Sequence, residues 1–437
     1  MTKKKLFEIL KNKKLNYVTV CFIDPLGQIR GKLVTIDKII KSIIDKNGSG
    51  FTVALPSLAL GYGDTQVEIS GFSSEKDSFG DIPAKIDLGS FRIIPWADET
   101  QNLICFLELE NDYSKFCSRS ILKKVLHEVN QLSFFPRFGV EIEFTLLEEN
   151  STSMRENNFL DLKTSTFESS YNLLHRQHEQ KNLYHELCEF SKIMNISVEA
   201  WHEEMGAGFM EVALLSGKDI KSADDAILVK HLIKQSALRF GKIATFMARW
   251  NNDADGQSGH IHISLENKKN ENIFIKNKKY FEQFILGLQR YSPELMLLFA
   301  PNNNSYKRFQ PDIFSPTKND WEWDNRKVAF RAIKGSNKRV ENRIPGADMN
   351  PYLSIAATIV SGMEGIKENK NFKEKQKIID LPLNISESYK HFKNSKLAQK
   401  TFSNDFVNFF SEFRRQESLI EHGLITDIEK KHLLEFS

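Results

Sequence analysis

The feature that most constrains the fold is a single stretch, PRFGVEIEFTLLEE, in the first half of the chain. In this stretch Glu141 and Glu143 alternate with Val140, Ile142 and Phe144, which is the period of a β-strand with one acidic and one apolar face. The apolar neighbours predict an interior position. Adjacent buried carboxylates repel each other unless a cation or a proton lies between them. The alternative is a half-exposed strand whose glutamates are solvated.

The composition is that of an ordinary soluble enzyme and argues against several classes of protein. The 437 residues are enough for two or three domains, and 41% hydrophobic and 27% charged residues are usual proportions. A formal net charge of +3 gives no reason to expect a nucleic acid or a membrane as a partner. The chain has no run of about 18 apolar residues, so we expect no membrane span.

The cysteines indicate a reducing compartment. Cys21, Cys105, Cys117 and Cys188 lie far apart and form no CxxC pair. Such usage is typical of reduced thiols that pack as small apolar groups. The basic N-terminus has too short an apolar part for a secretion signal. We therefore expect a cytoplasmic protein.

The order of predicted elements divides the chain into two parts of the α+β class. Residues 1–112 are rich in strands, with expected strands at 17–23, 28–34, 87–96 and 103–109. Residues 113–437 form a larger second domain. In that domain we expect strands at 136–149, 198–201, 206–214, 243–250 and 260–265, and helices at 118–132, 170–195, 220–240, 279–291 and 351–365.

Further carboxylates and imidazoles occur in three later segments. Glu204 and Glu211 bracket the glycine-containing stretch MGAG, and His260 and His262 share one face of a predicted strand. Glu341 follows in the segment KRVENR. Five carboxylates and a histidine can hold two divalent cations, and oxygen-rich ligation favours Mg²⁺ or Mn²⁺ over Zn²⁺. Such cations most often serve phosphoryl transfer.

Arginines accompany these acidic segments. They are Arg308, Arg326, Arg331, Arg339 and Arg343. Guanidinium groups bind phosphate and carboxylate through two parallel hydrogen bonds, so the combination favours a site for an anionic substrate and a metal-bound phosphate. The alternatives are an ion-pair network between strands and, for His262, a hydrogen-bonded core histidine. The chain has no Walker A motif, no GxGxxG with a distant acid and no GxSxG elbow.

These segments, in this order, resemble the glutamine synthetase family over nearly the whole chain. The matching motifs are VEIEF, EMGAGFMEV, GQSGHIHISL, PNNNSYKRF, WDNRKVAFR and KRVENRIPGADMNPYLSIAA. The resemblance implies a small β-grasp N-terminal domain and a larger catalytic domain with an antiparallel sheet flanked by helices. It also implies an ATP-dependent carbon–nitrogen ligase that assembles as a homo-oligomeric double ring, with each active site between neighbouring subunits.

Roles for individual residues follow from the matching motifs alone. The implied ligands of two to three Mg²⁺ or Mn²⁺ ions are Glu143, Glu204 and Glu211 at one position and Glu141, His260 and Glu341 at the other. The implied contacts to the ATP phosphates are His262, Arg331 and Arg339. The implied glutamate-binding residues are Arg308 and Arg343, with Gly256 beside them. Arg326 would steady the transferring phosphoryl group, and we assign catalytic roles to Arg308, Arg326 and Glu341.

Departures from the family pattern concern the second substrate. Family members that use ammonia carry a glutamate in the loop after the SYKR motif, where this chain has Phe314, and an aspartate in an N-terminal stretch that here reads GSGFTVALPSLAL. Both acidic groups of the ammonium pocket are therefore missing, and Phe314 becomes a candidate substrate-binding residue. Ala207 and Phe209 also replace the proline and glutamine of the family's GPGQ stretch.

We accordingly predict a glutamate–amine ligase that makes a γ-glutamylamide through a γ-glutamyl phosphate, with an organic amine as the acceptor. One alternative is glutamine synthetase proper, with other residues in the roles of the missing acids. Another is a non-catalytic ring, which the six retained metal ligands argue against. The identity of the amine, the choice between Mg²⁺ and Mn²⁺ and the ring size are not encoded in any motif that we can interpret.

Overall fold

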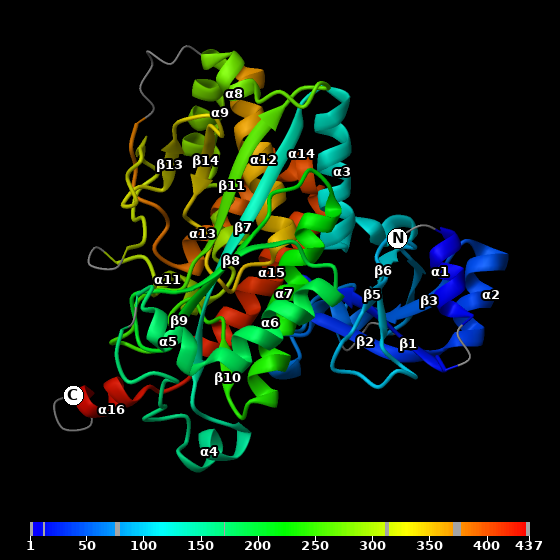
Figure 1. Cartoon of the computed structure of the whole chain (residues 1–437). Coiled ribbons are helices and arrows are strands. Elements are labelled where there is room, and N and C mark those ends of the chain that lie inside the picture. Colours follow the sequence, from blue (N-terminus) through cyan, green and yellow to red (C-terminus); the bar gives the residue numbers. More distant parts are fainter. Residues whose placement is uncertain are drawn as a thin grey trace.

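The computed structural model describes residues 3–11, 14–74, 79–169, 171–310, 314–369 and 377–433. Two separate β-sheets organise this part of the chain, a smaller one near the N-terminus and a larger one in the remainder (Figure 1). Helices pack on both sheets. The α+β class is confirmed, and the boundary at 112/113 remains a prediction.

The N-terminal sheet has the strand order β2-β1-β6-β4-β3, with β5 paired to β6. Its strands are β1 (Tyr17–Ile23), β2 (Ile29–Thr35), β3 (Ser49–Ala54), β4 (Asp81–Ile86), β5 (Arg92–Ile93) and β6 (Leu103–Leu109). Its helices are α1 (Lys3–Leu10) and α2 (Ile36–Lys46). The β1–β6 pair is parallel, and the other pairs in this sheet are antiparallel.

One strand prediction for this domain was wrong. The expected strand at 87–96 contains only β5, because the main chain turns after Asp87: Ser90 N donates to Asp87 O at 3.0 Å, and Gly89 N donates to the Asp87 carboxylate at 2.9 Å. The strands β3 and β4 were not predicted. Expected strand 17–23 coincides with β1.

The large sheet has the order β12-β13-β14-β11-β7-β9-β8, with β10 paired to β7. Its strands are β7 (Phe135–Leu147), β8 (Val198–Glu203), β9 (Phe209–Leu214), β10 (Ile243–Thr245), β11 (Gly259–Glu266), β12 (Trp321–Trp323), β13 (Phe330–Ile333) and β14 (Arg339–Asn342). The pairs are antiparallel except for the parallel β12–β13 pair at one edge.

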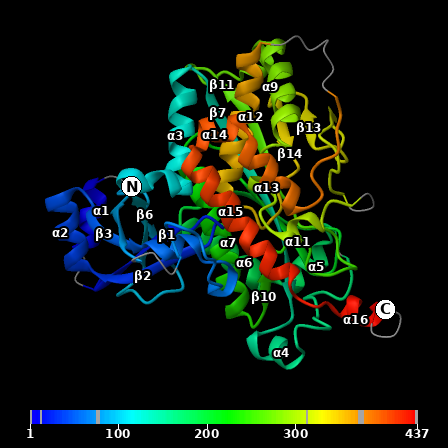
Figure 2. The ribbon, with the colours of Figure 1, turned by 180° about the vertical axis from the view of Figure 1, so that it is seen from behind.

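Helices cover one face of this sheet. The covering helices are α3 (Ser118–Gln131), α7 (Ile220–Arg239), α9 (Lys278–Tyr291) and α12 (Pro351–Glu368). The helices α9 and α12 lie behind β7 and β11 in Figure 1 and in front of them in Figure 2. The C-terminal helices are α13 (Ile385–Asn394), α14 (Lys396–Phe402), α15 (Asn404–His422) and α16 (Asp427–Leu433).

The remaining helices are short or peripheral. They are α4 (Ser151–Glu156), α5 (Leu174–Glu179), α6 (Lys181–Ile193), α8 (Ile273–Lys276), α10 (Met296–Phe299) and α11 (Asn303–Tyr306), with 3₁₀ helices at Leu55–Ala59, Tyr62–Asp64 and Asn111–Phe116. The expected helix at 170–195 is therefore two helices, α5 and α6, and residue 170 lies outside the described residues. Within the part of the chain that the structure describes, no helix is long and apolar enough to cross a bilayer.

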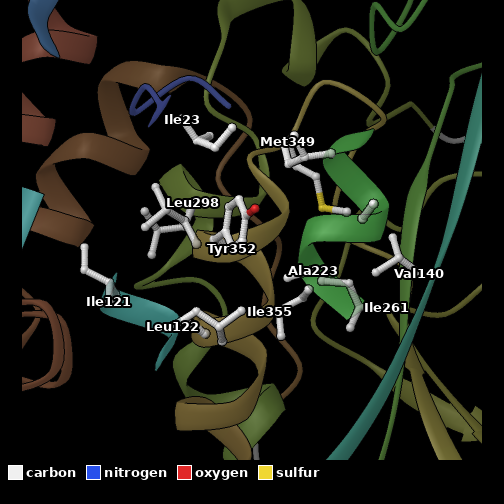
Figure 3. Packing of buried hydrophobic residues seen from close by; sticks show 14 of the residues in the cluster. Ile23, Ile121, Leu122, Val140, Ala223, Ile261, Leu298, Met349, Tyr352 and Ile355 are labelled. Atoms are coloured by element: carbon white, nitrogen blue, oxygen red, sulfur yellow. The ribbon is translucent and has the colours of Figure 1, made fainter. Parts of the chain in front are cut away.

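The helix α12 forms the centre of the core. Asn350 caps its N-terminus by accepting a hydrogen bond from Tyr352 N at 3.1 Å, and Pro351 occupies the first turn, where no N–H is needed. Asn369, in the left-handed conformation with φ 52°, ends it. The helix is buried over most of its surface, and both α3 and α9 pack against it. Figure 3 shows Tyr352 of this helix among Leu298 and other buried apolar side chains.

A buried ionic network joins the two parts of the chain. The Tyr352 hydroxyl donates to Asp224 at 2.7 Å, and Asp224 accepts two hydrogen bonds from Arg119, at 2.8 and 3.0 Å. Arg119 also pairs with Asp87, at 2.7 Å, and with Glu108, both from the N-terminal domain. Side chains of both domains thus share one guanidinium group.

Candidate active site

The predicted metal and phosphate ligands other than Glu204 lie on neighbouring strands of the large sheet, on the face away from the covering helices. The antiparallel register sets them opposite one another in cross-strand pairs: Glu143 with Glu211, Glu141 with His260, and Glu341 with both His262 and Arg331. The apolar face of β7 is buried against the core, with Val140, Ile142 and Phe144 at most 2% exposed. The strand prediction is therefore confirmed, and a single strand supplies two of the carboxylates.

The first group of potential metal ligands consists of Glu141, His260 and Glu341, which can each offer an atom within 4.8 Å of the others. His260 Nδ1 lies 3.6 Å from Glu141 Oε2 and 3.5 Å from Glu341 Oε1. On the other side of Glu141, His262 Nε2 is 3.1 Å from Oε1. Two carboxylates and an imidazole in this arrangement form a donor set that suits Mg²⁺ or Mn²⁺.

The second group shares His260 with the first and adds Glu143 and Glu211. Glu143 Oε2 accepts a short hydrogen bond from the backbone N–H of Ser258, which fixes its carboxylate. Both glutamates are buried. Glu204 is linked to this group by a histidine that we did not predict, which lies close to both Glu204 and Glu211.

That histidine is His202, on β8. Its Nε2 lies 3.0 Å from Glu204 Oε1 and 3.4 Å from Glu211 Oε1, so these three residues form another possible ligand set. The register places His202 directly opposite Glu211. A sequence signal existed, because His202 lies two residues before Glu204, the spacing that puts two side chains on one side of an extended chain.

The electrostatics of the cluster differ from one end to the other. Burial, followed by the charges of Glu141, Glu143, Glu204 and Glu341, raises the pKa of Glu211 to about 10. Burial also raises the pKa of Glu143, despite the opposing effects of His260 and the Ser258 N–H. The Glu143–Glu211 end therefore holds more negative charge than nearby protein cations offset, which is the condition for binding protons or metal ions.

The other end is better compensated. Burial opposes ionisation of Glu141, but His262 and His260 bring its pKa well below the ordinary range. Burial likewise opposes ionisation of Glu341, whose pKa is nevertheless lowered by His260, Arg343 and His262.

Three of the predicted arginines surround this end. Arg331 Nη1 lies 3.2 Å from Glu341 Oε2, Arg343 pairs with the other oxygen of Glu341, and Arg339 Nε approaches His262 Nδ1 at 3.1 Å. The structure therefore brings the predicted phosphate-binding groups His262, Arg331 and Arg339 next to the predicted metal ligands. A cavity of about 290 Å³ opens beside them, between Glu141 and Arg339.

Arg308 has a different environment. It is fully buried, and its guanidinium donates to Ser315 Oγ at 2.7 Å and to the carbonyl groups of Ile344 and Pro345 at 2.5 and 2.9 Å. Burial lowers its pKa to about 10, so it stays charged at neutral pH. A Cβ on Gly256 would lie 2.2 Å from Arg308 Cγ, which explains why glycine occupies that position. The roles of Arg308 and Gly256 toward glutamate remain predictions.

Arg326 and Phe314 lie apart from these contacts. Both are exposed, and among the residues that the structure describes Arg326 forms no ion pair with the carboxylate cluster. Phe314 follows residues 311–313, which lie outside the described residues. The expected function of each therefore still rests on the sequence motif.

Comparison with known proteins gives consistent results. The model of the family described as "Glutamine synthetase, catalytic domain" matches residues 115–432. Type-1 glutamine synthetase 2 of Dictyostelium discoideum is 33% identical, with 93% of this chain and 81% of the relative covered. Glutamate–isopropylamine ligase of a Pseudomonas species is 28% identical, with 99% and 97% covered. In fold, the solved structure of a GmaS–ADP complex is similar, with a TM-score of 0.82 at 22% identity over 98% of this chain and 99% of that one.

Proposed function

Because the chain belongs to the glutamine synthetase family, and is thus an ATP-dependent carbon–nitrogen ligase, we propose that it joins glutamate to an organic amine rather than to ammonia. Enzymes of this family use ATP and divalent metal ions, act on glutamate and form ring oligomers. The observation that carries the proposal is the loss of both acidic groups of the ammonium pocket, with Phe314 at one of the two places. An apolar side chain neither attracts a small cation nor accepts its proton.

The proposed reaction has two steps. An oxygen of the glutamate γ-carboxylate attacks the terminal phosphorus of ATP, and the bond from that phosphorus to the ADP oxygen breaks. The lone pair of a neutral amine then attacks the γ-carbon, the carbon–oxygen bond to phosphate breaks, and phosphate leaves with the electron pair. The nitrogen releases a proton to a site carboxylate or to water, and the product is a γ-glutamylamide.

The residues divide this work by position. Glu143, Glu204 and Glu211 would hold one metal ion, and Glu141, His260 and Glu341 another; the bound ions neutralise charge on the phosphates. His262, Arg331 and Arg339 would orient the ATP phosphates beside them. Positioning and electrostatic stabilisation of this type are the main contributions that a protein makes to phosphoryl transfer.

Glutamate would be held by the remaining basic groups. Arg343 lies next to Glu341 and is the arginine best placed to bind a substrate carboxylate. Arg308, whose side chain packs against Gly256, would be the second arginine for glutamate. Arg326 would stabilise the transferring phosphoryl group. As in the family, we propose a double ring in which a neighbouring subunit completes each site.

The relatives support both acceptors, so glutamine synthetase proper is the second candidate. The Dictyostelium relative is named as a glutamine synthetase, whereas other relatives are named for isopropylamine, ethanolamine (from Streptomyces coelicolor) and putrescine (from Escherichia coli). The specific observation in favour of ammonia is the 33% identity to the Dictyostelium enzyme.

The test is ADP release with ATP, glutamate and Mg²⁺ and, in turn, no acceptor, ammonium, methylamine, ethanolamine, 1,4-diaminobutane and an aromatic amine. We expect the highest kcat/KM with an organic amine. Equal or higher turnover with ammonium would favour the second candidate. Glu143→Ala should abolish turnover without altering the elution volume of the oligomer, and Glu148→Ala, at an exposed site five residues along, should leave turnover unchanged.

A further inference from the structure

Gln257 lies between a proposed glutamate-binding group and a proposed metal ligand. It belongs to the segment that leads into β11, and its side chain is completely buried. On one side, Gly256 packs against the Arg308 side chain so closely that no Cβ fits between them. On the other side, the N–H of Ser258 donates to the Glu143 carboxylate, and Ser258 O accepts from Glu143 N at 3.0 Å. The residues before and after Gln257 therefore contact two different parts of the site.

Each polar atom of the Gln257 amide has a hydrogen-bond partner. Oε1 accepts from the Thr145 hydroxyl at 2.5 Å, and Nε2 donates to the main-chain carbonyl groups of Thr245 at 3.2 Å and Met247 at 2.5 Å. Because only the NH₂ end of an amide can donate to two carbonyl oxygens, the side chain has one orientation. A buried network in which every polar group is paired is rigid. The side chain therefore ties β7 to the main chain at the end of β10 and just beyond it.

The main chain of Gln257 is also held on both sides. Its N–H donates to Ala248 O at 2.7 Å, and its carbonyl oxygen accepts from Ala347 N at 3.0 Å. Two residues before Ala347, the carbonyl of Pro345 accepts from the Arg308 guanidinium at 2.9 Å. A displacement of Gln257 would therefore move the main chain that surrounds Arg308 as well as the donor that holds the metal ligand.

The proposal that follows rests on the proposed ligase function. We propose that Gln257 is a positioning residue that couples the metal position at Glu143 to glutamate binding at Arg308. By fixing the main chain on both sides of itself, it keeps the Ser258 N–H directed at Glu143 and keeps Gly256 against the Arg308 side chain. Its amide is hydrogen-bonded to a threonine hydroxyl and to main-chain carbonyl groups, so its influence passes through the positions of the neighbouring peptide groups.

The two expected effects have different physical causes. A hydrogen bond to a metal-binding carboxylate orients it, and loss of such a partner typically weakens metal binding by about 10- to 100-fold. The effect on glutamate is steric, because the Gly256 main chain limits where the Arg308 side chain can lie, and a small displacement of a positioning group is costly. The proposed ATP contacts lie at the Glu341 end of the cluster, so ATP binding should be affected least.

The experiment measures metal affinity and substrate KM separately in the full-length oligomer. The affinity for Mn²⁺ is obtained from the electron paramagnetic resonance signal of the free ion, with metal-free protein and without ATP or an acceptor. The KM values for glutamate and ATP are obtained from ADP release with the acceptor that gives the highest turnover. Gln257→Met keeps the length of the side chain but removes all three hydrogen bonds. It should weaken Mn²⁺ binding and raise the KM for glutamate, each by about tenfold, and change the KM for ATP by less than about twofold.

A conservative pair at Thr145 and a matched glutamine separate positioning from stability. Thr145→Val keeps the shape of the side chain but removes the donor to Gln257, so both constants should move in the same direction by about threefold. Thr145→Ser keeps the hydroxyl and should stay closer to the wild type. Gln289 of α9 is also buried and donates to Asn319 O at 2.9 Å. Gln289→Met should lower the melting temperature but leave the Mn²⁺ affinity and both KM values unchanged.

The outcomes separate the inference from the function on which it rests. A Gln257→Met protein that loses stability but keeps the wild-type Mn²⁺ affinity and KM for glutamate would overturn the proposal, and so would a change in only one of these two constants. If Gln257→Met does not fold, equal constants in Thr145→Val and Thr145→Ser would overturn it instead. A preference for ammonium over every organic amine would overturn the proposed acceptor alone, because the Mn²⁺ affinity is measured without an acceptor.

Discussion

The cluster of buried, mutually repelling carboxylates leads to a prediction about stability that can be tested without knowing the substrate. Glu211 has a pKa of about 10 in the folded, metal-free chain and an ordinary value of 4.5. The folded state therefore keeps a proton that the unfolded state releases above pH 4.5. The free energy of unfolding falls as the pH rises through this window, and burial is the main cause.

The magnitude follows from linkage. Each pH unit between the two pKa values is worth about 1.36 kcal/mol, so the loss between pH 4.5 and pH 7 is about 3 kcal/mol. In Glu211→Gln no carboxyl group titrates at this position. Because Glu143 and Glu204 share the repulsion, part of the penalty persists, and we expect the metal-free variant to be more stable than the wild type by about 1–3 kcal/mol at pH 7.

Metal ions should reverse this order. A ligand that binds only the folded state at 100 times its Kd adds about 2.7 kcal/mol of stability, and the wild type retains a full ligand set whereas the variant does not. Urea unfolding after chelation, at pH 5.5, 7 and 8.5, and again with Mg²⁺ or Mn²⁺, measures both effects at one protein concentration. Glu128→Gln, on the exposed side of α3, is the matched control.

The reasoning would be refuted by a metal-free Glu211→Gln protein that is no more stable than the wild type at any of these pH values. It would also be refuted if the difference between the two proteins did not grow with pH, since the proton is then not held where the structure implies. A gain in stability from metal ions that is equal in both proteins would exclude Glu211 as a ligand.

Three further predictions concern other parts of the chain. Arg119→Met leaves Asp224 buried without its cation and should lower the free energy of unfolding by about 3–5 kcal/mol. The double variant that adds Asp224→Leu should recover part of this loss, and purely additive effects in chemical denaturation would contradict the pairing. Burial, followed by the charge of Lys234, lowers the pKa of Lys230 from 10.5 to about 7, so the unfolded state binds more protons between these two pH values. Lys230→Met should therefore raise the melting temperature at pH 6 and much less at pH 10. Equal increases at both pH values would argue against a buried ammonium group. Gly256→Ala places a methyl group against Arg308 and should cost about 1–3 kcal/mol of local strain. The strain should appear as a higher KM for glutamate with little change in the KM for ATP, and unaltered kinetics would show that the contact is not rigid.

The parts of the site that the sequence could predict are those encoded by strand periodicity. Glu141 and Glu143 share a face because the period of a strand is two, and His260 and His262 follow the same rule. Periodicity says nothing about which strand pairs with which, so the alignment of Glu143 with Glu211 could be anticipated only through the family resemblance. The spacing of His202 and Glu204 was a usable signal, but the alignment of His202 with Glu211 on a neighbouring strand was not.

The errors in the N-terminal domain have a different physical origin. Strands β3 and β4 pair with each other across a long connection, so they are recognised as strands by their pairing in the folded protein and not by a local sequence pattern. The segment at 87–96 has the composition of a strand, but the hydrogen bonds around Asp87 turn the chain there. Arg308 illustrates a further limit, because a motif can propose a role for an arginine without showing that main-chain carbonyl groups already engage its guanidinium.

The position of β7 in the large sheet has a consequence for how this sequence can vary. One edge of β7 aligns Glu141 with His260, and its other edge aligns Glu143 with Glu211. An insertion or deletion of one residue within β7 would turn every later side chain to the opposite face, moving carboxylates into the core and apolar groups into the site. Both proposed metal positions would be lost in one event, whereas single substitutions can alter them separately. Changes in length should therefore be confined to the loops at either end of β7, and a library of single-residue deletions scored for folding would show a sharply bounded intolerant segment there.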